Sequence, residues 1–76
     1  MAETYREIKF ERVEPQIARL TLARPKQMNA YTTRLCAEMV AAIEIYLRDD
    51  GLRVLIITGE GRGFCAGGDV LSVGAE

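Results

Sequence analysis

The stretch RVLIITGEGRGFCAGGD, residues 53–69, decides how this chain folds. Its first part is apolar at every position from Val54 to Ile57, and because side chains alternate along a strand, such a strand is apolar on both faces. The part that follows contains five of the seven glycines of the chain. Glycine gathers where the backbone turns sharply or approaches a ligand closely. The stretch therefore predicts a strand inside a covered sheet, followed by a loop at the carboxyl end, where open α/β sheets bind ligands.

Two shorter patterns upstream predict a β-hairpin. Apolar and polar residues roughly alternate over residues 5–13 and again over residues 17–22, and Pro15-Gln16 between them is typical of a turn. Each segment is therefore expected to form a strand with one exposed face. Together they predict a short antiparallel pair that opens the fold.

A helix is expected between the hairpin and the apolar strand. Thr32 or Thr33 is a suitable N-cap, and Gly51 is expected to close the helix in the left-handed conformation that other residues resist. Apolar residues recur at three- and four-residue steps, which indicates one buried face. The residues expected on that face are Cys36, Met39, Val40, Ile43 and Leu47, flanked by Leu35 and Tyr46. The residues expected largely on the opposite side are Arg34, Glu38, Glu44 and Arg48.

The order of these elements defines the class of the fold. A strand, a helix and a further strand form a crossover, so the strand at residues 53–58 is expected to run parallel to the strand at residues 17–22. The predicted class is α/β with ββαβ order. One helix covers only one face of the sheet, although the last strand is apolar on both faces. More protein, either a continuation of the chain or another subunit, is expected to cover the other face.

Composition and charge disfavour several classes of protein. The 76 residues carry a formal net charge of −1 with both signs interspersed, so no basic stripe is present and nucleic acid is not expected as a partner. Histidine is absent, and Cys36 and Cys65 lack CxxC spacing, so we expect no metal site and interpret the thiols as free and partly buried. The charged start, residues 1–10, indicates neither a signal peptide nor a membrane span. A cytoplasmic location is expected.

A nucleotide phosphate is one candidate ligand for the glycine-rich loop. The loop contains neither GxxxxGK[ST] nor GxGxxG followed by a helical pattern. It also lacks a lysine where a P-loop needs one. The sequence therefore disfavours nucleotide binding.

A second motif lies in the loop after the hairpin, RPKQMNA at residues 24–30, and it precedes FCAGGD at residues 64–69. The order Arg-Pro-x-x-x-Asn-Ala, helix, apolar strand ending in Thr-Gly, then Gly-x-Gly-x-x-Phe-Cys-Ala-Gly-x-Asp resembles the N-terminal signature of the enoyl-CoA hydratase (crotonase) superfamily. The resemblance covers nearly the whole chain and is specific for the family but not for the reaction. It implies that residues 1–76 are the N-terminal fragment of a single crotonase-like domain with a spiral fold, incomplete in this chain.

The resemblance implies roles for individual residues. In such enzymes the residue after the glycine of Ala-Gly-x-Asp, here Gly68, offers its backbone N–H to the thioester carbonyl oxygen in an oxyanion hole. The second donor and the carboxylates that act as general acid and base are implied to lie beyond Glu76. Contacts with CoA are implied for Arg24, Lys26, Ala30, Ala66 and Gly67.

Plainer interpretations stay open for these residues. A solvated position in the loop explains Arg24 and Lys26 equally well, although a charge-assisted contact with a phosphate is chemically reasonable. A tight turn equally explains Ala66-Gly67.

Neighbouring residues are interpreted as structural. Asn29 is expected to hold its loop by pairing backbone groups that would otherwise be buried without partners. Met28 and Tyr31 are interpreted as packing residues. Asp69 is favoured as a helix N-cap over a catalytic acid, and Glu60 as a solvated carboxylate.

The resemblance further implies what the complete protein does. It implies an enzyme that acts on an acyl-CoA thioester, most often by hydrating a 2-enoyl-CoA, with isomerisation or hydrolysis among the related reactions. It implies no cofactor beyond the CoA moiety of the substrate, and a homo-oligomer, either a trimer or a hexamer. The alternative is a non-catalytic CoA-binding or assembly fragment, which the missing carboxylates and the missing second donor suggest.

Overall fold

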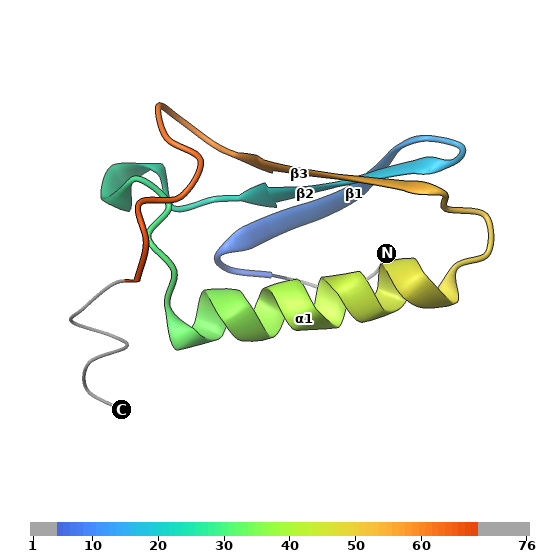
Figure 1. The fold of residues 1–76 in the computed structure, drawn as a ribbon, viewed down its shortest axis with the longest axis horizontal. Coiled ribbons are helices and arrows are strands. Elements are labelled where there is room, and N and C mark those ends of the chain that lie inside the picture. Colours follow the sequence, from blue (N-terminus) through green and yellow to red (C-terminus); the bar gives the residue numbers. More distant parts are fainter. Residues whose placement is uncertain (1–4, 69–76) are drawn as a thin grey trace.

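The computed structural model describes residues 5–68, which form a three-stranded sheet with one long helix against it (Figure 1). The elements in chain order are strand β1, Ile8–Glu14, strand β2, Ile17–Leu22, the short 3-10 helix η1, Pro25–Gln27, helix α1, Thr33–Arg48, and strand β3, Val54–Gly59. The ββαβ order predicted from the sequence is confirmed.

The sheet has the order β1-β2-β3, with β1 antiparallel and β3 parallel to β2. Ile8 is paired with Leu22, and Leu20 is paired with Ile57. The predicted hairpin and the predicted crossover are therefore both confirmed. Because β2 and β3 run in the same direction, their carboxyl ends lie at one edge of the sheet, and the loops that follow them leave from that edge (Figure 1).

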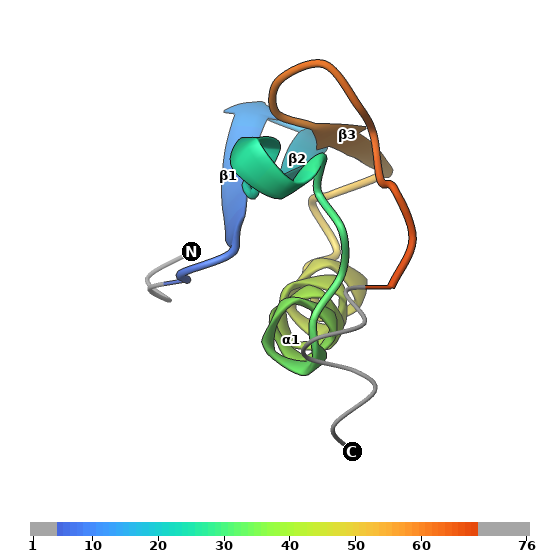
Figure 2. The same ribbon diagram turned by 90° about the vertical axis from the view of Figure 1, so that its left-hand side faces the viewer.

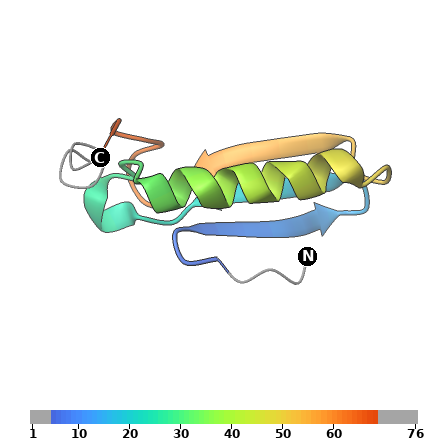
Figure 3. The ribbon, with the colours of Figure 1, turned by 90° about the horizontal axis from the view of Figure 1, so that it is seen from below.

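Helix α1 covers one face of the sheet, as the end-on view of Figure 2 and the view from below in Figure 3 show. The buried residues that form the core between the two layers are Ile8, Leu20, Leu22, Leu35 and Ala42. Each fully buried leucine stabilises the fold by about 1.5–3 kcal/mol relative to an exposed one. This small core therefore depends on the hairpin face and one side of α1.

The face of α1 that packs on the sheet agrees with the prediction only in part, since Met39 and Ile43 pack against the core as expected. Leu35 and Ala42 are buried, whereas Cys36 is exposed, Val40 is 57% exposed and Leu47 is 71% exposed. The helix is therefore rotated about its axis relative to the expected face. The spacing of apolar residues indicated a helix correctly, but several neighbouring positions offered alternative faces.

Glu38, expected on the solvated side, is buried with 8% exposure. Its carboxylate accepts hydrogen bonds from the backbone N–H groups of Arg6, at 3.0 and 3.1 Å, and Glu7, at 2.8 Å. Arg34, one turn earlier, adds a charged hydrogen bond of 2.8 Å. Burial acts to raise the pKa of the Glu38 carboxyl, but these hydrogen bonds outweigh it, and the pKa lies below its ordinary value of 4.5.

The two ends of α1 are closed in different ways. Thr32 is the N-cap, because its Oγ1 accepts a hydrogen bond of 3.0 Å from the N–H of Leu35, which decides between the two candidate threonines. The expectation for Gly51 is wrong: its φ is not positive. Instead, Asp49 ends the helix in an extended conformation and its Oδ1 accepts the Gly51 N–H at 2.9 Å.

Strand β3 keeps much of its apolar surface exposed. Leu55 packs against the core, so alternation directs Val54 and Ile56 to the opposite face of the sheet. Val54 is 48% exposed and Ile56 is 43% exposed. The described residues thus leave this face of β3 uncovered, as the apolar pattern predicts. Within residues 5–68, no helix combines the length and the apolar character that crossing a membrane requires.

Candidate active site

The two sequence motifs meet at the carboxyl edge of the sheet. The loop after β2 and the loop after β3 are far apart in the chain, yet they lie side by side in Figures 1 and 2. Two backbone hydrogen bonds join them, from Ala66 N–H to the Met28 carbonyl at 3.0 Å and from Tyr31 N–H to the Gly67 carbonyl at 2.8 Å. The motifs are therefore two halves of one structure.

Asn29 fixes the loop after β2 and links it to the loop after β3. Its side chain is fully buried, and its Oδ1 accepts the Arg24 N–H at 2.8 Å. Its Nδ2 donates to the carbonyls of Glu60, at 2.8 Å, and Gly63, at 2.7 Å. All three contacts satisfy backbone groups, which confirms the structural role predicted for this amide.

The backbone of this loop is also bent in a way that the sequence did not indicate. Met28 and Asn29 have φ angles of 52° and 56°, in the left-handed region. Asparagine tolerates this conformation, whereas it is uncommon for methionine. The hydrogen bonds of the Asn29 side chain hold the bend in place.

Glycines allow the second loop to pass close to the first. A Cβ at Gly59 would lie 2.6 Å from the carbonyl oxygen of Phe64 and 2.7 Å from that of Gly63, distances that a folded backbone does not accept. Gly67 has a φ of 111°, which strongly favours glycine. The turn itself therefore favours glycine at Gly59 and Gly67, in agreement with the plainer interpretation of Ala66-Gly67 as a tight turn.

The Gly67–Gly68 peptide has a defined orientation. Tyr31 and Gly68 form a parallel bridge in which the Gly67 carbonyl points toward the Tyr31 N–H. The peptide is trans, and the C=O and N–H of a trans peptide point in opposite directions. The Gly68 N–H therefore points away from the loop that contains Tyr31. Among residues 5–68, no group accepts a hydrogen bond from it.

The ring of Tyr31 lies against Gly68. A Cβ built on Gly68 would be 3.0 Å from both Cζ and Oη of Tyr31. Tyr31 is 38% exposed and Met28 is 37% exposed, so neither is part of the core. Met28 instead contacts the glycine-rich loop, since its Cε would be 2.9 Å from a Cβ at Gly63. Both side chains pack on the candidate site rather than inside the fold.

The two cations of the first loop have different surroundings. Arg24 is directed inward: its Nε is 3.1 Å from Glu7 Oε1, its Nη1 donates to the carbonyl of Ala30, and its side chain is only 16% exposed. Lys26 is exposed. The charge of Arg24 is thus already matched by a carboxylate, whereas Lys26 faces solvent. Contacts of either residue with CoA stay predictions, as do those of Ala30, Ala66 and Gly67.

The other titratable residues near the two loops contact groups other than the Gly68 N–H. Glu60 forms an ion pair with Lys9 of β1, so this loop carboxylate has a protein partner. Cys36 and Cys65 are free thiols and both are exposed, which corrects the expectation that they are partly buried. The N-cap role expected of Asp69 concerns a residue outside the described ones. Residues 5–68 contain no group of three or more potential metal ligands.

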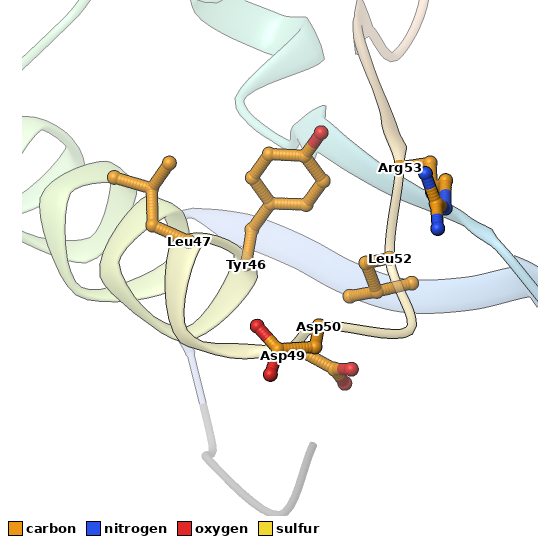
Figure 4. Close-up of a pocket in the computed structure, with 6 residues that line it drawn as sticks. All are labelled: Tyr46, Leu47, Asp49, Asp50, Leu52 and Arg53. Carbon is orange, nitrogen blue, oxygen red and sulfur yellow. The ribbon is translucent and has the colours of Figure 1, made fainter.

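A hollow at the opposite end of the molecule is separate from this site. It has a volume of about 560 Å³, and Figure 4 shows the residues that line it, Tyr46, Leu47, Asp49, Asp50, Leu52 and Arg53. These residues connect the C-terminal end of α1 to the start of β3, whereas the two motifs lie at the carboxyl end of β3. The Oδ2 atom of Asp49 forms an ion pair with Nη2 of Arg12 at 2.5 Å. This hollow therefore takes no part in the candidate site.

Fold and site together define a class: ββαβ crossover units in which the loops after two parallel strands are hydrogen-bonded to each other at the carboxyl ends of those strands. The sequence pattern described as enoyl-CoA hydratase/isomerase matches residues 17–76, and the chain belongs to this family. Its three strands and helix are the N-terminal part of the crotonase fold.

Individual relatives agree with this assignment. The chain is 41% identical to 1,2-epoxyphenylacetyl-CoA isomerase of Escherichia coli (strain K12) over 58 residues, 76% of this chain and 22% of that protein. It is 35% identical to trans-2-decenoyl-[acyl-carrier-protein] isomerase of Streptococcus mutans over 69 residues, 91% of this chain and 26% of that protein. A solved enoyl-CoA hydratase/isomerase from Mycobacterium paratuberculosis superimposes with a TM-score of 0.84 and 39% identity, covering 88% of this chain and 26% of that one. The chain thus spans about a quarter of each.

Proposed function

We propose that this chain supplies one half of an acyl-thioester site, in which the Gly68 N–H donates a hydrogen bond to the thioester carbonyl oxygen. The observation that supports this most directly is the orientation of the Gly67–Gly68 peptide. Tyr31 holds the carbonyl of that peptide at 2.8 Å, which turns the Gly68 N–H outward without a partner among residues 5–68. A donor fixed in this way loses little freedom when a ligand oxygen arrives.

The chemistry needs such a donor because charge moves to the thioester oxygen during the reaction. Addition of water to a 2-enoyl thioester, or migration of its double bond, passes through an enolate whose negative charge rests on that oxygen. Loss of one oxyanion donor from an enzyme typically lowers kcat by about 10²–10³. The second donor and the groups that move protons are proposed to come from protein outside residues 5–68.

The proposed substrate is an acyl-CoA, and the proposed reaction is hydration of a 2-enoyl-CoA in the complete protein. The names of two relatives support the thioester but differ in its carrier, since one names CoA and the other an acyl carrier protein. Exposed Lys26 is the loop cation proposed to contact a phosphate of the carrier, with Ala30 and Ala66-Gly67 along the pantetheine. A homo-oligomer is proposed from the family resemblance alone.

The direct test compares two substitutions at one position in the full-length protein. Gly68→Pro removes the N–H, whereas Gly68→Ala keeps it, so both alter the loop but only one deletes the donor. We expect crotonyl-CoA turnover by Gly68→Pro to fall by about 10²–10³, with a much smaller loss for Gly68→Ala. Equal turnover by Gly68→Pro and the parent protein would refute the role of this N–H.

A second candidate function is an assembly or binding fragment without activity of its own. It is favoured by the uncovered apolar side chains of β3, Val54 and Ile56, which are suited to contact with more protein. The absorbance of crotonyl-CoA measured with the 76-residue chain alone distinguishes the two candidates. We expect no turnover by the isolated chain and turnover by the full-length protein, whereas an inert full-length protein would favour the second candidate.

A further inference from the structure

The carboxylate of Glu7 joins two residues of the loop that carries Tyr31. Its Oε1 lies 3.1 Å from Arg24 Nε, and its Oε2 accepts a hydrogen bond of 2.7 Å from Thr32 Oγ1. The side chains of Glu7 and Arg24 are only 17% and 16% exposed, so water screens this ion pair less than a surface pair. Glu7 is thus a half-buried anion directed at the loop.

These two contacts fix the backbone on both sides of Tyr31. Arg24 donates from Nη1 to the carbonyl of Ala30, the residue before Tyr31. Thr32, the residue after Tyr31, is held directly by Glu7 and also caps α1 through the Leu35 N–H. Tyr31 is therefore bracketed by two anchor points that share one carboxylate.

The backbone of Glu7 is itself anchored, so its side chain is a rigid support. Its N–H donates to Glu38 Oε1 at 2.8 Å, and its carbonyl accepts the N–H of Ala23 at 2.9 Å. These contacts tie the segment before β1 to α1 and to the end of β2. The backbone that carries the Glu7 carboxylate is therefore anchored at two different places in the fold.

We propose that Glu7 is a positioning residue for the thioester site, acting through Arg24 and Thr32 on Tyr31 and hence on the Gly67–Gly68 peptide. The inference rests on the proposed function of the Gly68 N–H. Two consecutive glycines resist rotation poorly, and Gly67 already has a φ of 111°. The hydrogen bond from Tyr31 N–H therefore orients this peptide, and it does so only as well as Tyr31 itself is held.

This role gives Arg24 a different task from the phosphate contact that the family resemblance implies. Its guanidinium spans the gap between the Glu7 carboxylate and the Ala30 carbonyl, with donors directed at each. A guanidinium suits this bridge because its donors lie in a fixed plane, whereas a lysine ammonium offers a single point of charge. The outward Lys26 stays available for a phosphate.

The test compares Glu7→Gln with Glu11→Gln in the full-length protein. Glu11, on β1, pairs with Arg19 at 2.8 Å, and both of these side chains are largely exposed, so this control removes the same charge from an ion pair that does not reach the loops. We expect Glu7→Gln to lower kcat for crotonyl-CoA roughly tenfold with little change in KM, because misplacement of a reacting group by about 1 Å costs up to about 10²-fold. Glu11→Gln is expected to stay within about twofold of the parent, as for an exposed pair.

A second readout and a second variant distinguish the positioning role of Glu7 from a role in stabilising the fold alone. In ¹⁵N spectra of folded protein, we expect the Gly68 amide resonance to shift in Glu7→Gln and to stay in place in Glu11→Gln. The double variant Glu7→Gln/Arg24→Gln is expected to lose no more kcat than the more affected single variant, because both act along one path. If Glu7→Gln does not fold, Glu7→Asp, which keeps the charge but shortens the reach, takes its place with the same expected direction.

The outcomes distinguish this inference from the proposed function on which it rests. Full activity of Gly68→Pro would refute the proposed function. An inactive Gly68→Pro together with a Glu7→Gln variant whose kcat and Gly68 amide match those of Glu11→Gln would refute only the positioning role. Additive losses in the double variant would show that Glu7 does not act through Arg24.

Discussion

At the scale of single residues, Asn29 does more to hold the structure of the site than any group proposed to contact the ligand. One amide satisfies the Arg24 N–H and the carbonyls of Glu60 and Gly63, so two loops depend on its orientation. The motif position of this asparagine is therefore explained by backbone hydrogen bonding. Its chemistry is structural, although its effect on the site is direct.

Asn29→Asp tests this role with almost no change of shape. The substituted carboxylate still accepts from Arg24, but it places an oxygen where Nδ2 donates to two carbonyls. Two buried acceptors lose their donor and face an added negative charge, so we expect the free energy of unfolding to fall by about 2–4 kcal/mol. Urea denaturation measures the loss, with Gln27→Glu, at an exposed position of the same loop, as the control. A change of less than about 0.5 kcal/mol, typical of an exposed surface site, would contradict the account.

The Tyr31 ring leaves room for a glycine at position 68 but not for a larger residue. A methyl group at position 68 would lie 3.0 Å from two atoms of the Tyr31 ring, so the ring must move. We expect Gly68→Ala alone to shift the Tyr31 ring resonances and to raise KM. The double variant Gly68→Ala/Tyr31→Leu is expected to bring KM most of the way back to the parent value. A double variant that is no better than Gly68→Ala would show that the two side chains do not compete for space.

At the scale of elements, the sequence predicted the strands and the helix well but not the rotation of α1. The hairpin, the parallel crossover and the Thr32 cap follow from alternation, helical spacing and capping chemistry, which are local. Which side of α1 meets the sheet depends on Glu38 binding the N–H groups of Arg6 and Glu7, more than thirty residues away. A charged residue at helical spacing is normally read as exposed, so no local signal indicated this contact.

The same difference between local signals and long-range contacts applies to the residues of the candidate site. The glycine-rich loop is identifiable from the sequence because its residue type is unusual. The Asn29 amide is identifiable as support for its own loop through the Arg24 N–H, but its contacts with Glu60 and Gly63, more than thirty residues away, are not. The inward turn of Arg24 is not identifiable either, since its partner Glu7 belongs to the segment before β1. The end of α1 has a similar cause in part, because Asp49, which accepts the Gly51 N–H, is also paired with the distant Arg12.

Glu38 gives α1 a pH-dependent attachment to the segment before β1. Its pKa is lowered in the folded protein, so its contribution is fully present above the ordinary value of 4.5 and is lost as the pH falls below that value toward the folded pKa. We expect Glu38→Gln to lower the free energy of unfolding at pH 7 by about 1–3 kcal/mol, because hydrogen bonds to a charged group are lost. The same substitution should flatten the dependence of stability on pH below 4.5.

Thermal unfolding between pH 3 and pH 7 checks both expectations. Glu44→Gln is the matched control, since Glu44 lies on the same helix with an exposed side chain and only a distant contact of 3.9 Å with Arg48. Identical pH profiles for Glu38→Gln and the parent protein would rule out this attachment.

At the scale of the whole molecule, residues 5–68 form a two-layer unit whose sheet is covered on one face (Figure 2). The chain spans 22% and 26% of two curated relatives, and Val54 and Ile56 present apolar surface on the uncovered face. The uncovered apolar face and the proposed second donor outside residues 5–68 thus both point to contact with more protein.

The substitution Ile56→Lys tests whether more protein covers the exposed face of β3. In the 76-residue chain the side chain is 43% exposed, so we expect little loss of stability in urea denaturation. In the full-length protein we expect the same change to destabilise by several kcal/mol, because an unpaired charge would be buried. Equal and small effects in both proteins would show that nothing covers this face.

The most direct test of the central claim replaces single backbone amides by esters in the full-length protein, which is accessible by ligation of a synthetic segment. An ester at Gly68 deletes the proposed donor and leaves every side chain in place. A second ester, at Tyr31, keeps the Gly68 donor but deletes the hydrogen bond from Tyr31 N–H to the Gly67 carbonyl that orients it. We predict that kcat for crotonyl-CoA falls by about 10²–10³ with the Gly68 ester, which loses the donor, and by roughly tenfold with the Tyr31 ester, which loses only its orientation. A Gly68 ester that turns over substrate as fast as the parent protein would contradict the account.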